Sequence, residues 1–139
     1  MRVACLGGGP AGLYFSYLLK RRRPDAAVAV YEQNPPDATF GFGVVFSERA
    51  LEFLEAGDPG TFAAITPELE RWSDIALAHR GETVVVDGVG FAAIGRLRLL
   101  QLLRRRAEGA GVEIHYNRAF RGQDLLGGAG LLVGADGVN

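Results

Sequence analysis

The sequence predicts an α/β fold of the Rossmann type, built on a mostly parallel β-sheet with helices on both faces. The first observation is a short apolar run, Val3 to Leu6, that passes directly into the glycine pattern Gly7-x-Gly9-x-x-Gly12. The second is an apolar segment of helical length that follows this pattern. The third is another apolar run, Ala26 to Tyr31, which ends at Glu32. This acid lies about 20 residues past the last glycine, the spacing typical of a dinucleotide-binding unit.

The glycines of this pattern each have a steric role in a phosphate-binding turn. Gly7 makes the tight turn, Gly9 lets the backbone approach a pyrophosphate, and Gly12 lets the helix pack close to the strand. Pro10 suits the first helical turn, where the missing N–H has no helical partner, and the free N–H groups there attract an anion. Glu32 is placed to bind ribose hydroxyls and would repel a 2′-phosphate, so FAD or NAD is expected here and NADP is not.

A structural alternative exists for this pattern: a glycine-rich turn followed by a chance surface glutamate. The chain has 20 glycines, so the pattern alone is weak. The ordered succession of strand, turn, helix, strand and acid argues against the alternative.

Composition predicts a single globular domain spanning residues 1–139. The net charge of −1 gives no basis for a nucleic-acid partner or an anionic membrane surface. Cys5 is the only cysteine, so no disulfide within the chain is possible, and we expect it to be a small buried hydrophobe in the first strand. No apolar run approaches the roughly 18 residues that span a bilayer. These features predict a soluble cytoplasmic protein without a membrane partner.

The first helix should run from Pro10 to Arg22, with the basic run Lys20 to Arg23 in its last turn and Pro24 stopping it. Proline and Asx content makes 33–37 a loop. Phe40 to Phe46 then interleaves aromatic residues with glycine, which fits a strand entry or a backbone segment lying against a flat ligand equally well.

Beyond this segment, Ser47 is a predicted N-cap for a helix that reaches Ala56, and a shorter helix covers Thr61 to Ile65. Trp72 to His79 and Glu82 to Asp87 should form a hairpin around Arg80-Gly81, giving a small sheet beside the main one.

A strongly amphipathic helix is predicted from Arg96 to Glu108, followed by a parallel strand, Val112 to Tyr116. The final strand, Leu131 to Val133, runs into Gly134-Ala135-Asp136-Gly137. The two histidines, His79 and His115, have no carboxylate or cysteine at metal-ligand spacing, so no metal site is expected.

The chain resembles the FAD-dependent aromatic hydroxylases of the para-hydroxybenzoate hydroxylase type, the class A flavin monooxygenases. Three signatures occur in the family's order: Gly7-Gly8-Gly9-Pro10-Ala11-Gly12 with Glu32, the helix opening Gly95-Arg96-x-x-Leu99, and Gly134-Ala135-Asp136-Gly137. Within the family, Thr39 to Ser47 is similar to a segment of the members that hydroxylate salicylyl-CoA and 2-aminobenzoyl-CoA.

The resemblance implies a role in FAD binding for each of these signatures. The glycine turn, Gly7 to Gly12, would hold the pyrophosphate. The other implied cofactor-binding residues are Glu32 at the adenosine ribose, its neighbour Gln33, Phe42, Gly43, Val44 and Val45 beside the isoalloxazine, Arg96 near the phosphates or ribityl chain, and Asp136 at the pyrophosphate region. The structural alternatives are a solvated first-turn arginine for Arg96 and an ordinary Asp-Gly turn for Asp136.

The chemistry implied by the resemblance belongs to the cofactors. NADH or NADPH reduces FAD, O₂ adds to give a flavin hydroperoxide, and an aromatic substrate, in this subgroup a CoA thioester, receives the distal oxygen. No side chain of this chain is identified as catalytic, and the substrate and oligomeric state stay open.

Complete members of the family continue well past the Asp-Gly motif, with a second ribose motif and most of the substrate-binding sheet. We therefore expect residues 1–139 to be the N-terminal part of a longer enzyme, to bind FAD weakly alone and to be inactive alone. The alternatives are another FAD- or NAD-dependent oxidoreductase with this fold, or a non-catalytic fragment.

Overall fold

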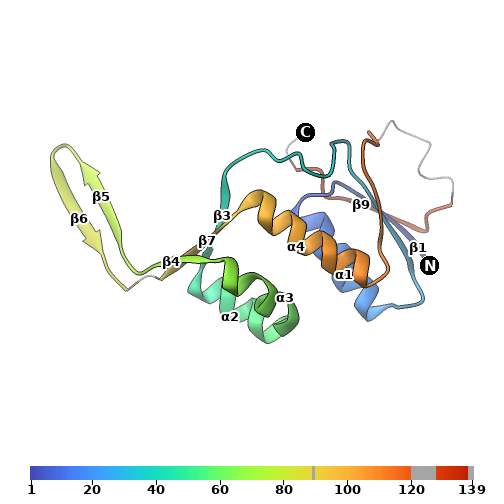
Figure 1. Cartoon of the computed structure of the whole chain (residues 1–139), viewed down its shortest axis with the longest axis horizontal. Coiled ribbons are helices and arrows are strands. Elements are labelled where there is room, and N and C mark those ends of the chain that lie inside the picture. Colours follow the sequence, from blue (N-terminus) through green and yellow to red (C-terminus); the bar gives the residue numbers. More distant parts are fainter. Residues whose placement is uncertain (89, 120–127, 138–139) are drawn as a thin grey trace. The chain divides into compact units, whose positions relative to one another are not determined.

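The computed structural model describes residues 1–88, 90–119 and 128–137, and the chain forms two compact units. The first unit consists of Met1–Phe40 together with Leu100–Asn139, and the second is Gly41–Leu99. Helix α4 (Arg96–Gly109) carries the chain from the second unit back into the first (Figure 1). Among the described residues, the first unit contains a four-stranded sheet, and the second contains a three-stranded sheet and a two-stranded one.

The first unit contains a parallel four-stranded sheet in the order β8-β2-β1-β9. Its strands are β1 (Arg2–Leu6), β2 (Ala27–Tyr31), β8 (Glu113–His115) and β9 (Leu131–Gly134). In this register Val3 is level with Val28 on one side and Leu131 on the other. The predicted parallel sheet is confirmed, with strand boundaries within two residues of those expected.

One face of this sheet carries the core of the first unit. Valine and cysteine side chains of β1 and β2 pack there against α1 (Pro10–Arg22) and the second half of α4. The buried members of the cluster are Val3, Cys5, Tyr17, Ala26, Val28, Val30, Ala107 and Val112. The sequence predicted helices on both faces, whereas α1 and α4 share this face in the described residues. The physical reason is handedness, because successive right-handed crossovers from β1 to β2 to β8 move in one direction across the sheet.

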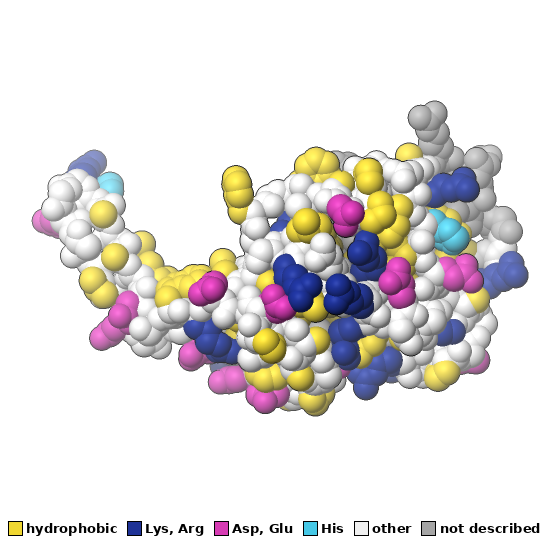
Figure 2. All heavy atoms as spheres, in the orientation of Figure 1, with side chains coloured by type: hydrophobic (Ala, Val, Ile, Leu, Met, Phe, Trp, Pro, Cys, Tyr) yellow, Lys and Arg dark blue, Asp and Glu magenta, His cyan; other side chains and the backbone are white. Residues whose placement is uncertain are grey.

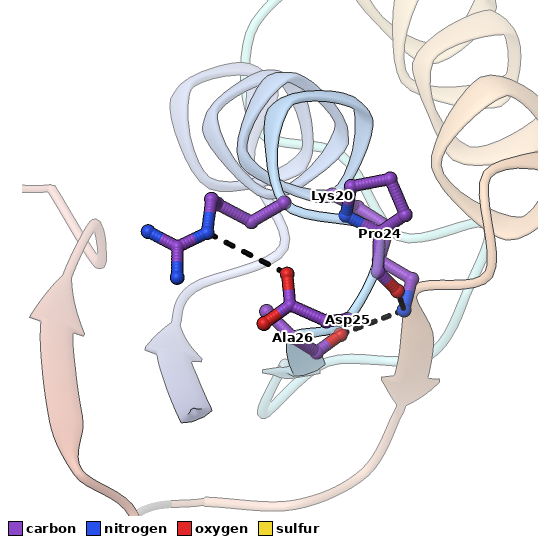
Figure 3. Close-up of polar contacts among 5 residues, drawn as sticks. Lys20, Pro24, Asp25 and Ala26 are labelled. Atoms are coloured by element: carbon purple, nitrogen blue, oxygen red, sulfur yellow. Dashed lines mark hydrogen bonds and ion pairs between the residues drawn. The ribbon is translucent and has the colours of Figure 1, made fainter.

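The end of α1 is closed by a side chain of the predicted basic run. Lys20 Nζ donates hydrogen bonds to the carbonyl oxygens of Pro24 at 2.9 Å and Ala26 at 2.6 Å (Figure 3). Next to it, Arg23 forms an ion pair with Asp25, with 3.5 Å between Nε and Oδ1. Lys20 therefore does more than complement the helix dipole, because it ties the last turn of α1 to the start of β2.

The second unit contains an antiparallel sheet in the order β3-β7-β4. The strands are β3 (Gly43–Ser47), β7 (Phe91–Gly95) and β4 (Glu70–Trp72). The sequence did not predict β7, the central strand, because the run Phe-Ala-Ala-Ile-Gly lacks both polar alternation and β-branched residues apart from Ile94. The expected strand over Trp72 to His79 is in fact two strands, which belong to different sheets.

Two short helices of the second unit begin at side-chain caps. The Ser47 hydroxyl oxygen accepts a hydrogen bond of 3.2 Å from the Ala50 N–H and caps α2 (Glu48–Gly57), as predicted. Helix α3 (Pro59–Ile65) begins at Asp58, a buried carboxylate that accepts from the backbone N–H of Thr61 at 3.3 Å. A 3₁₀ turn, Thr66–Glu68, follows it.

The predicted hairpin is present as β5 (Ile75–His79) and β6 (Glu82–Val86). Arg80 and Gly81 both have positive φ, 49° and 83°, as a two-residue hairpin turn of type I′ requires. Its apolar side chains lie at the surface, including Leu77, Val84 and Val85 (Figure 2).

Within the described ranges, the structure has no helix that is long and apolar enough to cross a membrane.

Gly12 gives a test of the packing between α1 and the turn after β1. A methyl group at Gly12 would overlap the Gly7 carbonyl oxygen and approach Cys5 Sγ to 3.3 Å. We expect Gly12→Ala to lower the free energy of unfolding by about 1–3 kcal/mol, the usual cost of overpacking. Gly109→Ala at the end of α4 is the matched control, because nothing lies within 4 Å of its added methyl. Equal denaturant midpoints for the two variants would contradict this packing.

Candidate functional site

The ends of three neighbouring parallel strands meet at one edge of the sheet in the first unit. Gly7 follows β1, Glu32 follows β2 and Ala135 follows β9. The Gly7 N–H donates to the Tyr31 carbonyl at 2.8 Å, and the Ala135 N–H donates to the Leu6 carbonyl at 2.7 Å. The carboxyl edge of a parallel sheet is where α/β proteins place ligands, so the fold brings these predicted residues to a suitable position.

Two features require glycine at position 7: its backbone conformation and the close approach of a neighbouring segment. Its φ of 101° lies in the region that favours glycine. A methyl group added there would overlap the Ala135 carbonyl oxygen and lie 2.8 Å from the Asp136 nitrogen. The glycine turn and the 134–137 motif, identified separately in the sequence, therefore pack against each other.

Gly8 and Gly9 have opposite surroundings. A methyl group on Gly8 would lie 2.9 Å from the Glu32 Cβ and 3.2 Å from its Oε2, so glycine is needed where the acid lies against the turn. A methyl group on Gly9 would meet no atom of the described residues within 4 Å. The position predicted to approach a pyrophosphate thus faces open space.

The N-terminus of α1 has no side-chain cap. Gly9 is the N-cap residue, Pro10 is in the first turn, and no acidic residue stands in that turn. The first N–H groups of a helix have no partner inside the helix, so the backbone donors of Ala11 and Gly12 lie at the positive end of the helix dipole without a partner in that helix. Uncapped donors of this kind suit an anionic group.

The Glu32 carboxylate is fixed by three hydrogen bonds. Its Oε2 accepts from the Gly8 N–H at 2.7 Å. Its Oε1 accepts from the backbone N–H of Asn34 at 2.8 Å and from the Asn34 Nδ2 at 2.7 Å. The carboxylate therefore bridges the phosphate-binding turn and the loop after β2.

Some of the residues around Glu32 were predicted and others were missed. Gln33, which was predicted, is exposed, whereas its neighbour Asn34 holds the carboxylate and was not singled out. The backbone after β8 also braces the acid, because the Glu32 N–H donates to the His115 carbonyl and the Arg118 N–H donates to the Glu32 carbonyl, both at 2.9 Å. The sequence signal for Asn34 was its position in a turn-forming segment two residues after Glu32, because Asn side chains in turns often form local hydrogen bonds.

Asp136 lies just beyond β9 and is exposed. Its backbone nitrogen is the part of it that approaches Gly7. The structure therefore places it at the same sheet edge as the turn.

The remaining predicted residues lie in the second unit. The Arg96 N–H donates to the Phe42 carbonyl at 3.1 Å, and Arg96 Cδ would lie 3.8 Å from a methyl group on Gly41. The Nε of Arg96 is buried and has no hydrogen-bond partner in the part of the chain that the structure describes. The Phe42 side chain is 102% exposed at the entry to β3. Gly43, Val44 and Val45 follow it in the strand, with Val44 level with Ile94 of β7 and Val45 exposed.

Other chemistries find little support in the described ranges. They hold no cluster of three or more His, Cys, Asp or Glu side chains that could bind a metal ion. His115 stacks on Tyr31, with 5.0 Å between ring centroids, and His79 lies in the hairpin. Cys5 is fully buried, as expected for a structural thiol.

The comparisons with known proteins point to oxygenases of aromatic compounds. No protein-family model matches the chain. Among solved structures, Pseudomonas aeruginosa PqsL in complex with 2-aminobenzoylacetate matches with a TM-score of 0.71 and 20% identity, over 90% of this chain and 36% of that one. The likeness to this structure shows the fold alone. The sequence relatives show homology: over its whole length the chain is homologous to part of two aromatic monooxygenases.

Two curated relatives make this homology specific. A salicyloyl-CoA 5-hydroxylase from a Streptomyces species is 46% identical over 139 residues, which are 100% of this chain and 27% of the relative. A 3-hydroxy-4-methyl-anthranilyl-[aryl-carrier protein] 5-monooxygenase from Streptosporangium sibiricum is 29% identical over 138 residues, or 99% of this chain and 38% of the relative. The chain thus spans between a quarter and two fifths of the length of these relatives.

Cys5 gives a prediction on pH dependence. Burial raises the pKa of its thiol, so the folded state favours the protonated form. Stability from this group is fully present below the thiol's unfolded pKa of about 8.5 and is lost as pH rises through the higher folded pKa. We expect Cys5→Ala to flatten the fall in unfolding free energy above about pH 8.5, measured by urea titration at each pH. An unchanged pH slope in the variant would rule out this role.

Proposed function

We propose that this chain is the FAD-binding part of an NADH- or NADPH-dependent monooxygenase that hydroxylates an aromatic ring carried as a CoA thioester. The observation that supports it most directly is the convergence of an uncapped helix N-terminus, open space at Gly9 and a fixed carboxylate at Glu32. The substrate class is supported by the name of the relative that is 46% identical.

The residues of the first unit fit the adenosine diphosphate half of FAD. The pyrophosphate would lie against Gly9 and the first N–H groups of α1, where no side chain competes for the donors. The ribose would lie beside Glu32, whose carboxylate accepts hydroxyl hydrogens. Asp136 and Gln33 lie at the same edge of the sheet and would form the border of this site. The side chains of both residues are exposed to solvent.

Within the second unit, taken by itself, the predicted cofactor-binding residues offer exposed apolar surface and a buried polar donor. Phe42 and Val45 expose apolar surface, which an isoalloxazine ring would cover. The buried Nε–H of Arg96, which has no partner among the described residues, would donate a hydrogen bond to an acceptor atom of FAD. Gly43 and Val44 would supply backbone along the ring.

When bound, FAD supplies the redox chemistry, taking electrons from NADH or NADPH and directing one oxygen atom of O₂ to the substrate. The chain itself binds and orients the cofactor. The negative charge of Glu32 would exclude a 2′-phosphate from the adenosine site, a constraint on the nucleotide bound there and not on the choice between NADH and NADPH as electron donor. We further infer a cytosolic location, with which a single buried thiol agrees.

A second function class uses the same geometry. Glu32 and the glycine turn would also accept the adenosine half of NAD, as in a dehydrogenase. Retention of flavin by the protein separates the two proposals.

Gly9 allows a direct test of cofactor placement. Its φ of −71° and ψ of 179° are open to any residue, so Gly9→Ala should leave the melting temperature unchanged. The added methyl would occupy the space proposed for the pyrophosphate, so we expect FAD affinity to fall about tenfold or more, measured by quenching of flavin fluorescence. Gly57→Ala, another open position at the end of α2, should change neither quantity. Wild-type affinity in Gly9→Ala would place the pyrophosphate elsewhere.

The activity is tested on the product of the complete reading frame. With FAD present, we expect salicyloyl-CoA or 2-aminobenzoyl-CoA to stimulate NADH or NADPH oxidation and to gain one oxygen atom by mass spectrometry. Free salicylate is the control for recognition of the CoA portion. A protein that retains no flavin, or that oxidises the donor without hydroxylating any aromatic acyl-CoA, would refute the proposed function.

A further inference from the structure

We propose that Asn34 is a positioning residue, which holds the Glu32 carboxylate so that a single acceptor site, on Oε2, faces the ribose of a bound adenosine nucleotide. This inference rests on the proposed function, because it concerns the same site. In this proposal, Glu32 and Asn34 together bind the adenosine part of the nucleotide, whereas the sequence pattern identifies only Glu32.

Asn34 donates two hydrogen bonds to one oxygen of the Glu32 carboxylate. Its backbone N–H and its Nδ2 reach Oε1 at 2.8 and 2.7 Å. Hydrogen bonds to a charged acceptor are stronger than those between neutral groups, and two of them to one oxygen fix the rotation of the carboxylate. Asn34 is itself restrained, because its carbonyl accepts from the Asn117 N–H at 3.3 Å.

The number of acceptor sites decides where a ligand can bind. An ionised carboxylate offers about four lone-pair sites, two on each oxygen. Asn34 fills both sites on Oε1, and the Gly8 N–H fills one on Oε2. The site that remains is on the oxygen that already contacts the phosphate-binding turn. A hydroxyl bound there is next to a pyrophosphate on the same turn, which is the order of groups in adenosine diphosphate.

The amide is the functional group that this position needs. Alanine would keep the backbone donor and lose Nδ2, which frees one site on Oε1 and lets the carboxylate turn. Aspartate, of nearly the same size, would place a second negative charge where Nδ2 now lies 2.7 Å from Oε1. We therefore expect Asn34→Asp to be more harmful to nucleotide binding than Asn34→Ala.

The experiment is a double-mutant cycle on the product of the complete reading frame, with ADP and FAD as probes and isothermal titration as the measurement. Asn34→Ala should weaken ADP and FAD binding roughly tenfold, the loss expected for one hydrogen bond to a charged group. In a Glu32→Ala background the same change should have no effect, because Asn34 acts through the carboxylate. Asn34→Asp should weaken binding further, and Asp37→Asn, an exposed change in the same loop, should match wild type.

The outcomes separate this inference from the proposed function. An equal loss on Asn34→Ala with and without Glu32 overturns the positioning role, because a general structural effect does not depend on the carboxylate. Wild-type affinity in Asn34→Ala overturns it as well. Binding of ADP with the predicted coupling, but no binding of FAD, supports the role of Asn34 and counts against the flavin function. Binding of neither probe by the wild-type product of the complete reading frame overturns both.

Discussion

The meeting of three parallel strand ends is the constraint on which the candidate site depends. β1, β2 and β9 run in one direction, so Gly7, Glu32 and Ala135 come together without any further device. The packing there leaves no room for a side chain at position 7 or 8, since a methyl on Gly7 would overlap Ala135 and one on Gly8 would meet Glu32. Two of the glycines thus serve the protein's own contacts, and Gly9 is left facing open space.

The sequence predicted those parts of the structure that depend on local order along the chain. The strand, turn, helix, strand and acid of the first unit follow each other within residues 1–32, and each is specified by its neighbours in sequence. The caps at Ser47 and the turn at Arg80-Gly81 are local in the same sense, and they too are confirmed.

What the sequence could not predict depends on contacts between distant segments or on the direction of a side chain. β7 is a central strand because β3 and β4 pair with it on either side, although its alanines give no strand pattern. Asn34 is important because its amide points back at Glu32, and composition indicates only a turn. The shared face of α1 and α4 follows from strand order, which a pattern of periodicities does not contain. The roles of the predicted site residues toward a cofactor stay predictions.

The contact between Gly7 and the segment after β9 also bears on how the chain folds. β1 and β2 are joined through α1 alone, whereas β9 reaches β1 only after the chain has closed a loop on the order of a hundred residues. Pairing at such separation is slow, so the phosphate-binding turn acquires its final surroundings late, with the docking of β9. A nucleotide that binds the finished turn stabilises the docked state by mass action. A higher concentration of such a nucleotide would then raise the fraction of the protein in which β9 is docked.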